Sequence, residues 1–155
     1  MFSSPVTKTV GGIGYGAGMP DDKGARLTAG NVGAPILLVE DDFMLRGSLA
    51  AVLNSEGYTV ECAANALDAL RRLERAPKPS LILLDIMLPY MDGCEFRALQ
   101  RNKREIADIT VIVITAVGLR AEVADDLDLH QTFFKPLDRP KLLDAIRRHV
   151  APQIG

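Results

Sequence analysis

The apolar residues of this chain gather in five short runs, and longer segments of mixed polarity separate them. Most of these runs show no alternation of apolar and polar positions, which is typical of strands covered on both faces in a parallel sheet. The expected strands are residues 36–39, 58–62, 81–84, 109–114 and 132–134. The third run, Leu81–Leu84, stops at Asp85, and Pro89 with Asp92-Gly93 then marks a loop and the start of a helix.

The segments between the runs carry apolar residues at helical spacing and predict five helices. They are expected at 43–56, at 66–73 before Pro77 and Pro79, at about 93–104 with Phe96 and Leu99 inward, at 119–127 as a short acidic helix, and from Asp138 with Leu142, Leu143, Ile146 and Val150 buried. Strands that alternate with helices imply a parallel sheet with right-handed crossovers. The predicted fold class is therefore α/β, a doubly wound five-stranded parallel sheet.

Polar side chains stand at the ends of four expected strands. Glu40 and Asp41 follow the first strand, Asp85 the third, Thr115 the fourth and Lys135 the fifth. Because the carboxyl ends of parallel strands lie at one edge of the sheet, we expect these side chains to share one site. With the strand order 2-1-3-4-5, the crevice falls between strands one and three, at the acidic cluster.

Three carboxylates in one site repel and raise one another's pKa unless a cation intervenes. Mg²⁺ suits such a site, since it prefers hard oxygen ligands and takes one or two carboxylates with phosphate oxygens. Asp85 can then attack phosphorus to give an acyl phosphate, while the Lys135 ammonium and the Thr115 hydroxyl bind phosphoryl oxygens. Taken singly, Glu40 or Asp41 fits a helix cap equally well, and Thr115 and Lys135 fit ordinary strand-end and surface positions. Four such residues at four strand ends favour one shared site.

Composition limits the classes of protein that remain. The 155 residues suffice for one domain, and 48% apolar with 25% charged residues is the balance of a globular protein. A formal net charge of −2 gives no sign of a direct nucleic-acid binder. Cys62 and Cys94 lack metal-ligand spacing and do not suggest disulfides, and His130 and His149 lie in no ligand pattern. Without an apolar run near 18 residues or a signal peptide, we expect no membrane insertion and a cytoplasmic location.

Residues 1–33 hold most of the 13 glycines and few large apolar side chains, which predicts a flexible arm. The glycines match a phosphate-binding loop only weakly, because no strand precedes them and no Gly-Lys-Ser/Thr follows. The folded domain is expected at 34–152, and 153–155 form a short tail. Two arginine-rich faces, at Arg71, Arg72 and Arg75 and at Arg97, Arg101 and Arg104, are interpreted as solvated helix surfaces.

Residues 34–151 resemble the receiver domain of two-component response regulators. The matching segments are Leu38–Asp42, Leu84–Gly93, Val113–Ala116 and Phe134–Leu137, in this order and spacing. The resemblance implies the flavodoxin-like order 2-1-3-4-5, and a phosphoryl group accepted on Asp85 from a histidine kinase or a histidine phosphotransfer protein. It implies Mg²⁺ held by Glu40, Asp41, Asp85 and the backbone carbonyl of Met87, with Asp42 only a neighbour. It also implies a cis peptide at Lys135-Pro136.

Two features depart from the pattern of the family. An aromatic residue usually stands three positions before the lysine, where this chain has Thr132, and neither Phe133 nor Phe134 is an obvious substitute. The preceding stretch also lacks the small Gly-Ala pair that is often found there, so the switch is expected to work differently. Met87 and Val117, two residues after Asp85 and Thr115, are apolar and cannot activate a water, which predicts slow hydrolysis of the acyl phosphate.

The chain is thus predicted to be a stand-alone receiver, with no room for a DNA-binding module after the last helix. It is expected to catalyse only its own phosphorylation and dephosphorylation, and to signal through a downstream protein target, with a phosphorylation-dependent homodimer among its contacts. One alternative is a receiver-like interaction module that works without phosphorylation. A metal-dependent phosphatase is a further alternative, but it needs a second carboxylate where Met87 stands.

Overall fold

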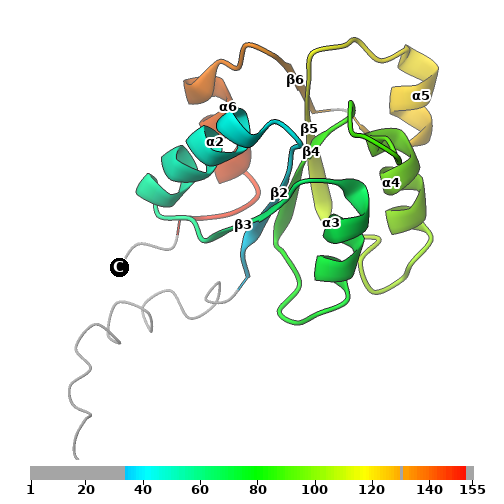
Figure 1. The fold of residues 1–155 in the computed structure, drawn as a ribbon, viewed down its shortest axis with the longest axis horizontal. Coiled ribbons are helices and arrows are strands. Elements are labelled where there is room, and N and C mark those ends of the chain that lie inside the picture. The colour runs from blue at the N-terminus through cyan, green and yellow to red at the C-terminus, as the bar shows by residue number, and fades with distance from the viewer. Residues whose placement is uncertain (1–33, 130, 153–155) are drawn as a thin grey trace, which may run out of the picture. The chain divides into compact units, whose positions relative to one another are not determined.

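The computed structural model describes residues 34–129 and 131–152, and within them five parallel strands form one sheet (Figure 1). The strands are β2 (Ile36–Val39), β3 (Val60–Ala63), β4 (Leu81–Asp85), β5 (Thr110–Thr115) and β6 (Thr132–Phe134). Their order across the sheet is β3-β2-β4-β5-β6, which in chain order is 2-1-3-4-5. Both the predicted fold class and the predicted strand order are confirmed.

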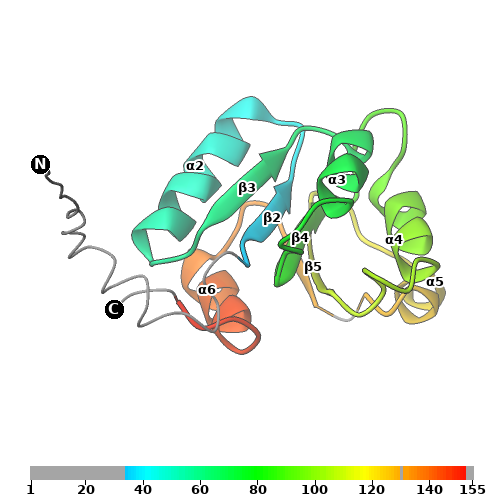
Figure 2. The same cartoon turned by 90° about the horizontal axis from the view of Figure 1, so that it is seen from below.

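Helices cover both faces of the sheet. The helices are α2 (Phe43–Ser55), α3 (Ala66–Leu73), α4 (Gly93–Arg101), α5 (Ala121–Asp126) and α6 (Arg139–Arg147). Figure 2 shows α2 and α6 on one side of the strands, and α3, α4 and α5 on the other. Among the described helices, none is long and apolar enough to cross a membrane.

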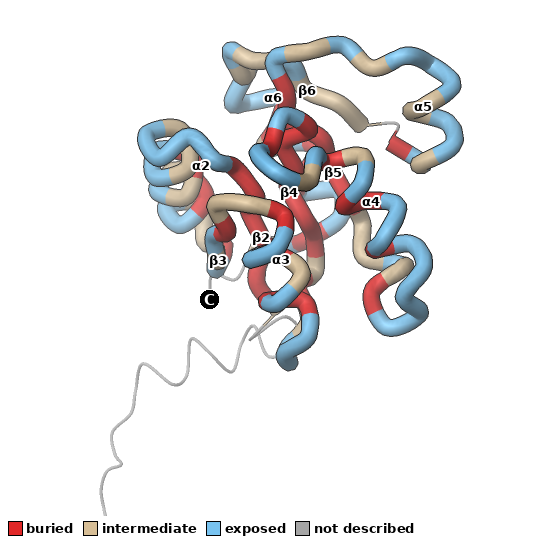
Figure 3. Tube along the Cα trace, turned by 45° about the vertical axis from the view of Figure 1, so that its right-hand side comes forward, coloured by how far each residue is buried: buried red, intermediate tan, exposed pale blue. Residues whose placement is uncertain are grey.

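Two separate cores follow from the geometry of the strands. Successive side chains of a strand point to opposite faces, so Leu37 and Val39 pack toward α3 and α4, whereas Ile36 and Leu38 pack toward α2 and α6. All four are at most 1% exposed, and Figure 3 shows the strands as the buried centre of the fold. Strands covered on both faces explain why the sequence has unbroken apolar runs there.

The prediction for α4 was wrong in two respects, the position of its C-terminal end and the burial of Leu99. The helix ends at Arg101 rather than near residue 104, and Leu99 is 40% exposed although Phe96 is fully buried. The position one turn after Phe96 belongs to Gln100, whose side chain is also fully buried. Its amide donates to the carbonyls of Ile106 and Ile109, so a polar residue takes the place expected for an apolar one.

The interpretation of both arginine-rich faces as solvated was also wrong in part. Arg71, Arg75, Arg101 and Arg104 are exposed, but Arg72 and Arg97 are only 7% and 5% exposed. Arg72 forms an ion pair with Glu61, and Arg97 donates to the carbonyl of Leu127. Guanidinium groups can be buried when their fixed donors find acceptors, and helical spacing alone does not reveal such acceptors.

Some predictions fall outside the described residues. These are the flexible arm at 1–33, the tail at 153–155 and the placement of His130. Cys62 and Cys94 are both free thiols.

Candidate functional site

The ends of β2 and β4 bring three acidic side chains together. The strands are neighbours in the sheet, with Val39 paired to Leu84, so the residues that follow them meet at one edge. One carboxylate oxygen from each of Glu40, Asp41 and Asp85 lies within 4.8 Å of the others. The acidic cluster that the strand ends predicted is therefore present at the switch point of the sheet.

Lys135 reaches this cluster from the end of β6. Its Nζ donates to Glu40 Oε1 at 2.7 Å and to Asp85 Oδ2 at 3.0 Å. The backbone N–H of Lys135 donates to the carbonyl of Thr115 at 2.9 Å, which fixes the base of the lysine against β5. The Lys135-Pro136 peptide is cis, as expected.

Burial raises the free-energy cost of the charged side chains in this site. Glu40 and Asp85 are 0% and 2% exposed, and the Lys135 side chain is 22% exposed. Burial raises the pKa of Glu40, and hydrogen bonds from Lys135 and from the backbone of Asp42 offset this only in part. Burial lowers the pKa of Lys135, but its bonds to Glu40 and Asp85 outweigh that effect, so the pKa is raised. The lysine therefore stays charged, and the site keeps an excess of carboxylates.

The helix-cap alternative for Glu40 or Asp41 is resolved in favour of a third residue. Asp42 caps α2, because its Oδ1 accepts from the backbone N–H of Leu45 at 3.1 Å. Glu40 instead accepts from the N–H of Asp42 at 3.0 Å through Oε2. The exposed carboxylate of Asp41 is thereby left to face the cluster from the solvent side.

Backbone donors orient the other two predicted residues. Asp85 Oδ1 accepts from the N–H of Met87 at 2.9 Å, so the loop after β4 holds the carboxylate in one direction. Thr115 is fully buried at the end of β5, and its Oγ1 accepts from the N–H of Val117 at 3.3 Å. Within residues 34–129 and 131–152 this hydroxyl donates to no other group, so its proton can be donated to a bound group.

Sequence reasoning missed two residues that shape the site. A Cβ on Gly93 would lie 2.7 Å from the backbone oxygen of Asp85 and from Cα of Ile86, so only glycine allows α4 to start this close to β4. The side chain of Arg46 donates to the carbonyls of Glu40 and Asp41 at 2.8 and 3.3 Å. The pair Asp92-Gly93 was visible as a helix start, but not its contact with Asp85, and no pattern marked Arg46.

The sequence model of the response regulator receiver domain matches residues 36–147. The chain belongs to this family. Sporulation initiation phosphotransferase F of Bacillus subtilis is 37% identical over 117 residues, which cover 74% of this chain and 92% of the relative. The CpxR homolog of Haemophilus influenzae, a transcriptional regulatory protein, is 39% identical over 83 residues, which cover 54% of this chain and 34% of the relative. The chain thus spans only about a third of that regulator.

Solved receiver structures have the same fold. A CheY-like receiver domain protein from Methanospirillum hungatei gives a TM-score of 0.69 at 28% identity, over 77% of this chain and 95% of that one. The chemotaxis protein CheY4 of Vibrio cholerae also gives 0.69, over 76% and 99% of the two chains, but at 24% identity it shows the fold alone.

This receiver carries no aromatic side chain at the position three residues before its lysine. Thr132 is half-buried there, and its hydroxyl donates to the carbonyl of Leu129 at 3.4 Å. Phe133 packs against the core beneath α2 and α6, and Phe134 is 54% exposed. Side chains alternate along β6, so Phe133 points to the opposite face from Thr132, whereas Phe134 lies on the same face as Thr132 and is exposed.

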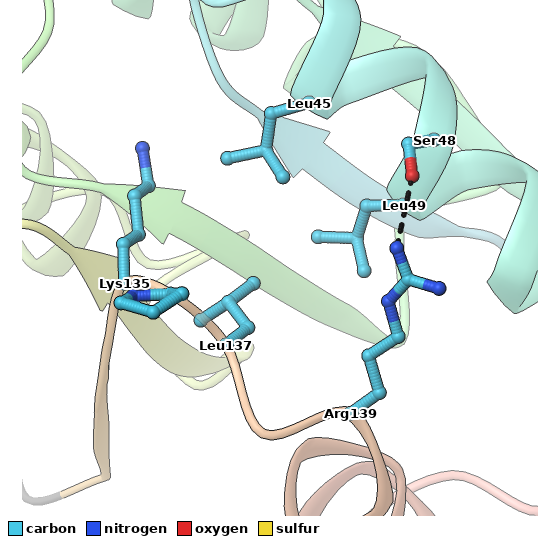
Figure 4. A pocket seen from close by; sticks show the side chains of 7 residues that line it. Leu45, Ser48, Leu49, Lys135, Leu137 and Arg139 are labelled. Carbon is cyan, nitrogen blue, oxygen red and sulfur yellow. Dashed lines mark hydrogen bonds between the residues drawn. The ribbon is translucent and has the colours of Figure 1, made fainter.

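Apolar side chains surround the site on its exposed side. Five of the exposed large apolar residues lie at a strand end, follow one or open α2: Phe43, Met44, Met87, Tyr90 and Phe134. Beside Lys135, Leu45, Leu49 and Leu137 line a groove between α2 and the loop before α6, where Arg139 donates to Ser48 at 3.2 Å (Figure 4). Exposed apolar surface of this kind is typical of contacts with other proteins.

Proposed function

We propose that this receiver accepts a phosphoryl group on Asp85 from a phosphohistidine, in a Mg²⁺-dependent reaction, and passes the signal on through protein contacts. The donor is a histidine kinase or a histidine phosphotransfer protein. The observation that carries the proposal is the buried Asp85 carboxylate, bonded to Lys135 and within 4.8 Å of the oxygens of Glu40 and Asp41. Similarity to a relative named a phosphotransferase, over 92% of its length, supports the same chemistry.

The acidic cluster suits Mg²⁺ by the nature of its donors. Its three carboxylates supply hard oxygen atoms within 4.8 Å of one another, and exposed Asp41 leaves one side open to water, which Mg²⁺ retains. Glu40, Asp41, Asp85 and the carbonyl of Met87 would hold the ion. When bound, the cation supplies positive charge that offsets the charge of the transferring group.

The transfer step can be written with the residues of this chain. A carboxylate oxygen of Asp85 attacks phosphorus, and an O–P bond forms as the P–N bond to the donor imidazole breaks. The imidazole nitrogen keeps the electron pair of that bond and takes up a proton from solvent. Lys135 exchanges a carboxylate oxygen for a phosphoryl oxygen, and the Thr115 hydroxyl donates to another. Their placement at fixed strand ends lowers the barrier mainly through orientation and charge.

Intact-mass measurement after incubation with acetyl phosphate, with and without Mg²⁺, tests this proposal. Wild type should gain one phosphoryl group only when Mg²⁺ is present, and Asp85→Asn should gain none. Asp108→Asn is the matched control, because Asp108 is exposed and lies before β5, at the opposite end of the strand from Thr115. Folded wild type that gains no phosphoryl group would instead support the interaction module that works without phosphorylation.

We also propose two properties of the biological setting of this receiver. They are a cytoplasmic location and a homodimer that forms on phosphorylation. The exposed apolar residues around the site, Met87 and Tyr90 among them, support protein partners for the site itself. Steady turnover of a phosphate ester, in place of a single adduct, would favour the phosphatase alternative.

A further inference from the structure

Helix α5 depends on contacts from outside itself. It has six residues, none of which is buried, and its N-cap residue Arg120 makes no capping bond through its side chain. Helices this short are unstable on their own. The helix ends in a Schellman motif, in which Leu129 N–H donates to the carbonyl of Ala124 and Asp128 N–H to that of Asp125. Asp128 adopts a φ of 56°, a conformation that favours glycine.

Two arginines of α4 bind the last carbonyls of α5. Arg97 Nε donates to the carbonyl of Leu127 at 2.9 Å, and Arg101 donates to that of Asp126. Arg97 also forms an ion pair with the carboxylate of Asp128 at 3.8 Å. The last carbonyls of a helix have no partner within it. Cations near a helix C-terminus also interact favourably with the negative end of the helix dipole. Figures 1 and 2 show α4 and α5 side by side.

A buried polar network fixes Arg97 in this position. Its Nη1 donates to Gln100 Oε1 at 2.8 Å, and the amide of Gln100 donates to the carbonyls of Ile106 and Ile109. Arg97 is 5% exposed and Gln100 fully buried. Because the guanidinium cannot swing into solvent, a displacement of α4 must displace the end of α5 or break the bond to Leu127.

The other end of α4 lies against the phosphoacceptor strand. Gly93 N–H donates to the carbonyl of Ile86 at 2.8 Å, and a Cβ on Gly93 would lie 2.7 Å from the backbone oxygen of Asp85. Asp92 and Glu95 close a capping box at this end. The start of α4 therefore has no free space in which to absorb a movement of the β4 end.

We infer that Arg97 and Arg101 form a clamp through which the phosphorylation state of Asp85 sets the conformation of α5. This inference rests on the proposed function, because it requires a phosphoryl group on Asp85. A group added there must be accommodated by the loop between Asp85 and Gly93, and α4 carries the resulting shift to the carbonyls of α5. The clamp offers a route to α5 in a receiver that has Thr132 in place of the usual aromatic residue.

Hydrogen–deuterium exchange on the full chain, with and without acetyl phosphate and Mg²⁺, tests the clamp. In wild type, exchange of the peptide covering 121–129 should change on phosphorylation by about threefold or more. In Arg97→Met, the same peptide should exchange about tenfold faster before phosphorylation, since bonds to a charged donor are lost, and the phosphorylation-dependent change should disappear. Arg101→Met, an exposed position whose loss does not open the core, should weaken the change in the same direction.

The control is Arg71→Met, which removes an exposed arginine that pairs with Asp68 on α3, and it should behave as wild type. The intact mass of each sample separates the two proposals. A sample without the phosphoryl adduct contradicts the proposed function. A wild-type adduct with unchanged exchange at 121–129, or a full change that persists in both Arg97→Met and Arg101→Met, overturns the clamp.

Discussion

At the scale of single residues, the site holds more carboxylates than cationic groups. Glu40 and Asp85 are buried with a single ammonium between them, and Asp41 adds a third carboxylate. One lysine cannot neutralise three acids, and burial makes the charges of Glu40 and Asp85 costly. The protein therefore gives up stability at this site, and a bound cation would restore it. This is the usual relation between stability and a charged functional site.

Substituting Glu40 by Gln should therefore stabilise the protein in Mg²⁺-free buffer. Burial raises the pKa of Glu40 above its ordinary value of 4.5. An acid with a higher pKa in the folded state binds its proton more tightly there, so its ionisation lowers the free energy of unfolding as pH rises through this range. Urea unfolding of wild type and E40Q should show the variant more stable at pH 8, with the difference shrinking toward pH 4. A variant less stable than wild type at pH 8 contradicts this account.

Under the proposed function, we expect the side chains beside Asp85 to set the lifetime of its acyl phosphate. Met87 is 57% exposed and, like Val117, cannot bind or activate a water molecule. Met87→Asn supplies an amide that can orient water for attack on phosphorus, and we expect this positioning to speed hydrolysis by about tenfold. The lifetime of the adduct, followed by intact mass after removal of acetyl phosphate, should fall accordingly. Leu67→Asn on exposed α3 surface is the control, and loss of the wild-type adduct within seconds would refute the prediction of slow hydrolysis.

At the scale of elements, the joint between β4 and α4 holds Asp85 in place. In Gly93→Ala the new Cβ meets backbone atoms of Asp85 and Ile86 at 2.7 Å, and these atoms cannot rotate away. Such overpacking costs about 1–3 kcal/mol, and we expect slower phosphorylation by acetyl phosphate as well. Gly47→Ala is the matched control, because no described atom lies within 4 Å of its Cβ and a helix gains about 0.5–1 kcal/mol from the change. Chemical denaturation should show a lower free energy of unfolding for Gly93→Ala and a higher one for Gly47→Ala than for wild type.

The elements also show which parts of the structure the sequence predicts. Unbroken apolar runs indicated the strands, and the polar residues at their ends indicated the acidic cluster, because parallel strands share an edge. The burial of Arg97 and Gln100 was not predictable in this way. Arg97 is satisfied by the carbonyl of Leu127, 30 residues away, and Gln100 by the carbonyl of Ile106 in the turn after α4. Helical spacing classifies such polar residues as solvated, because it does not reveal acceptors outside the helix.

At the scale of the whole molecule, the proposed cation site depends on the folded sheet. The carboxylates come from the ends of two strands, β2 and β4, and are brought together only when the sheet forms. An ion that binds this arrangement and not the unfolded chain must stabilise the fold, by about 2.7 kcal/mol at a concentration one hundred times its Kd. The stability of the entire domain therefore reports on the candidate metal site.

Thermal unfolding with increasing Mg²⁺ measures this coupling. The Tm of wild type should rise with Mg²⁺, and NaCl at equal ionic strength should not reproduce the rise, since screening alone does not bind the cluster. Asp41→Asn should lose most of the Mg²⁺-dependent shift yet remain folded, because its side chain is exposed and caps no helix. Asp108→Asn should keep the full shift. An equal response of Asp41→Asn and wild type would place the ion elsewhere and remove Asp41 from the site.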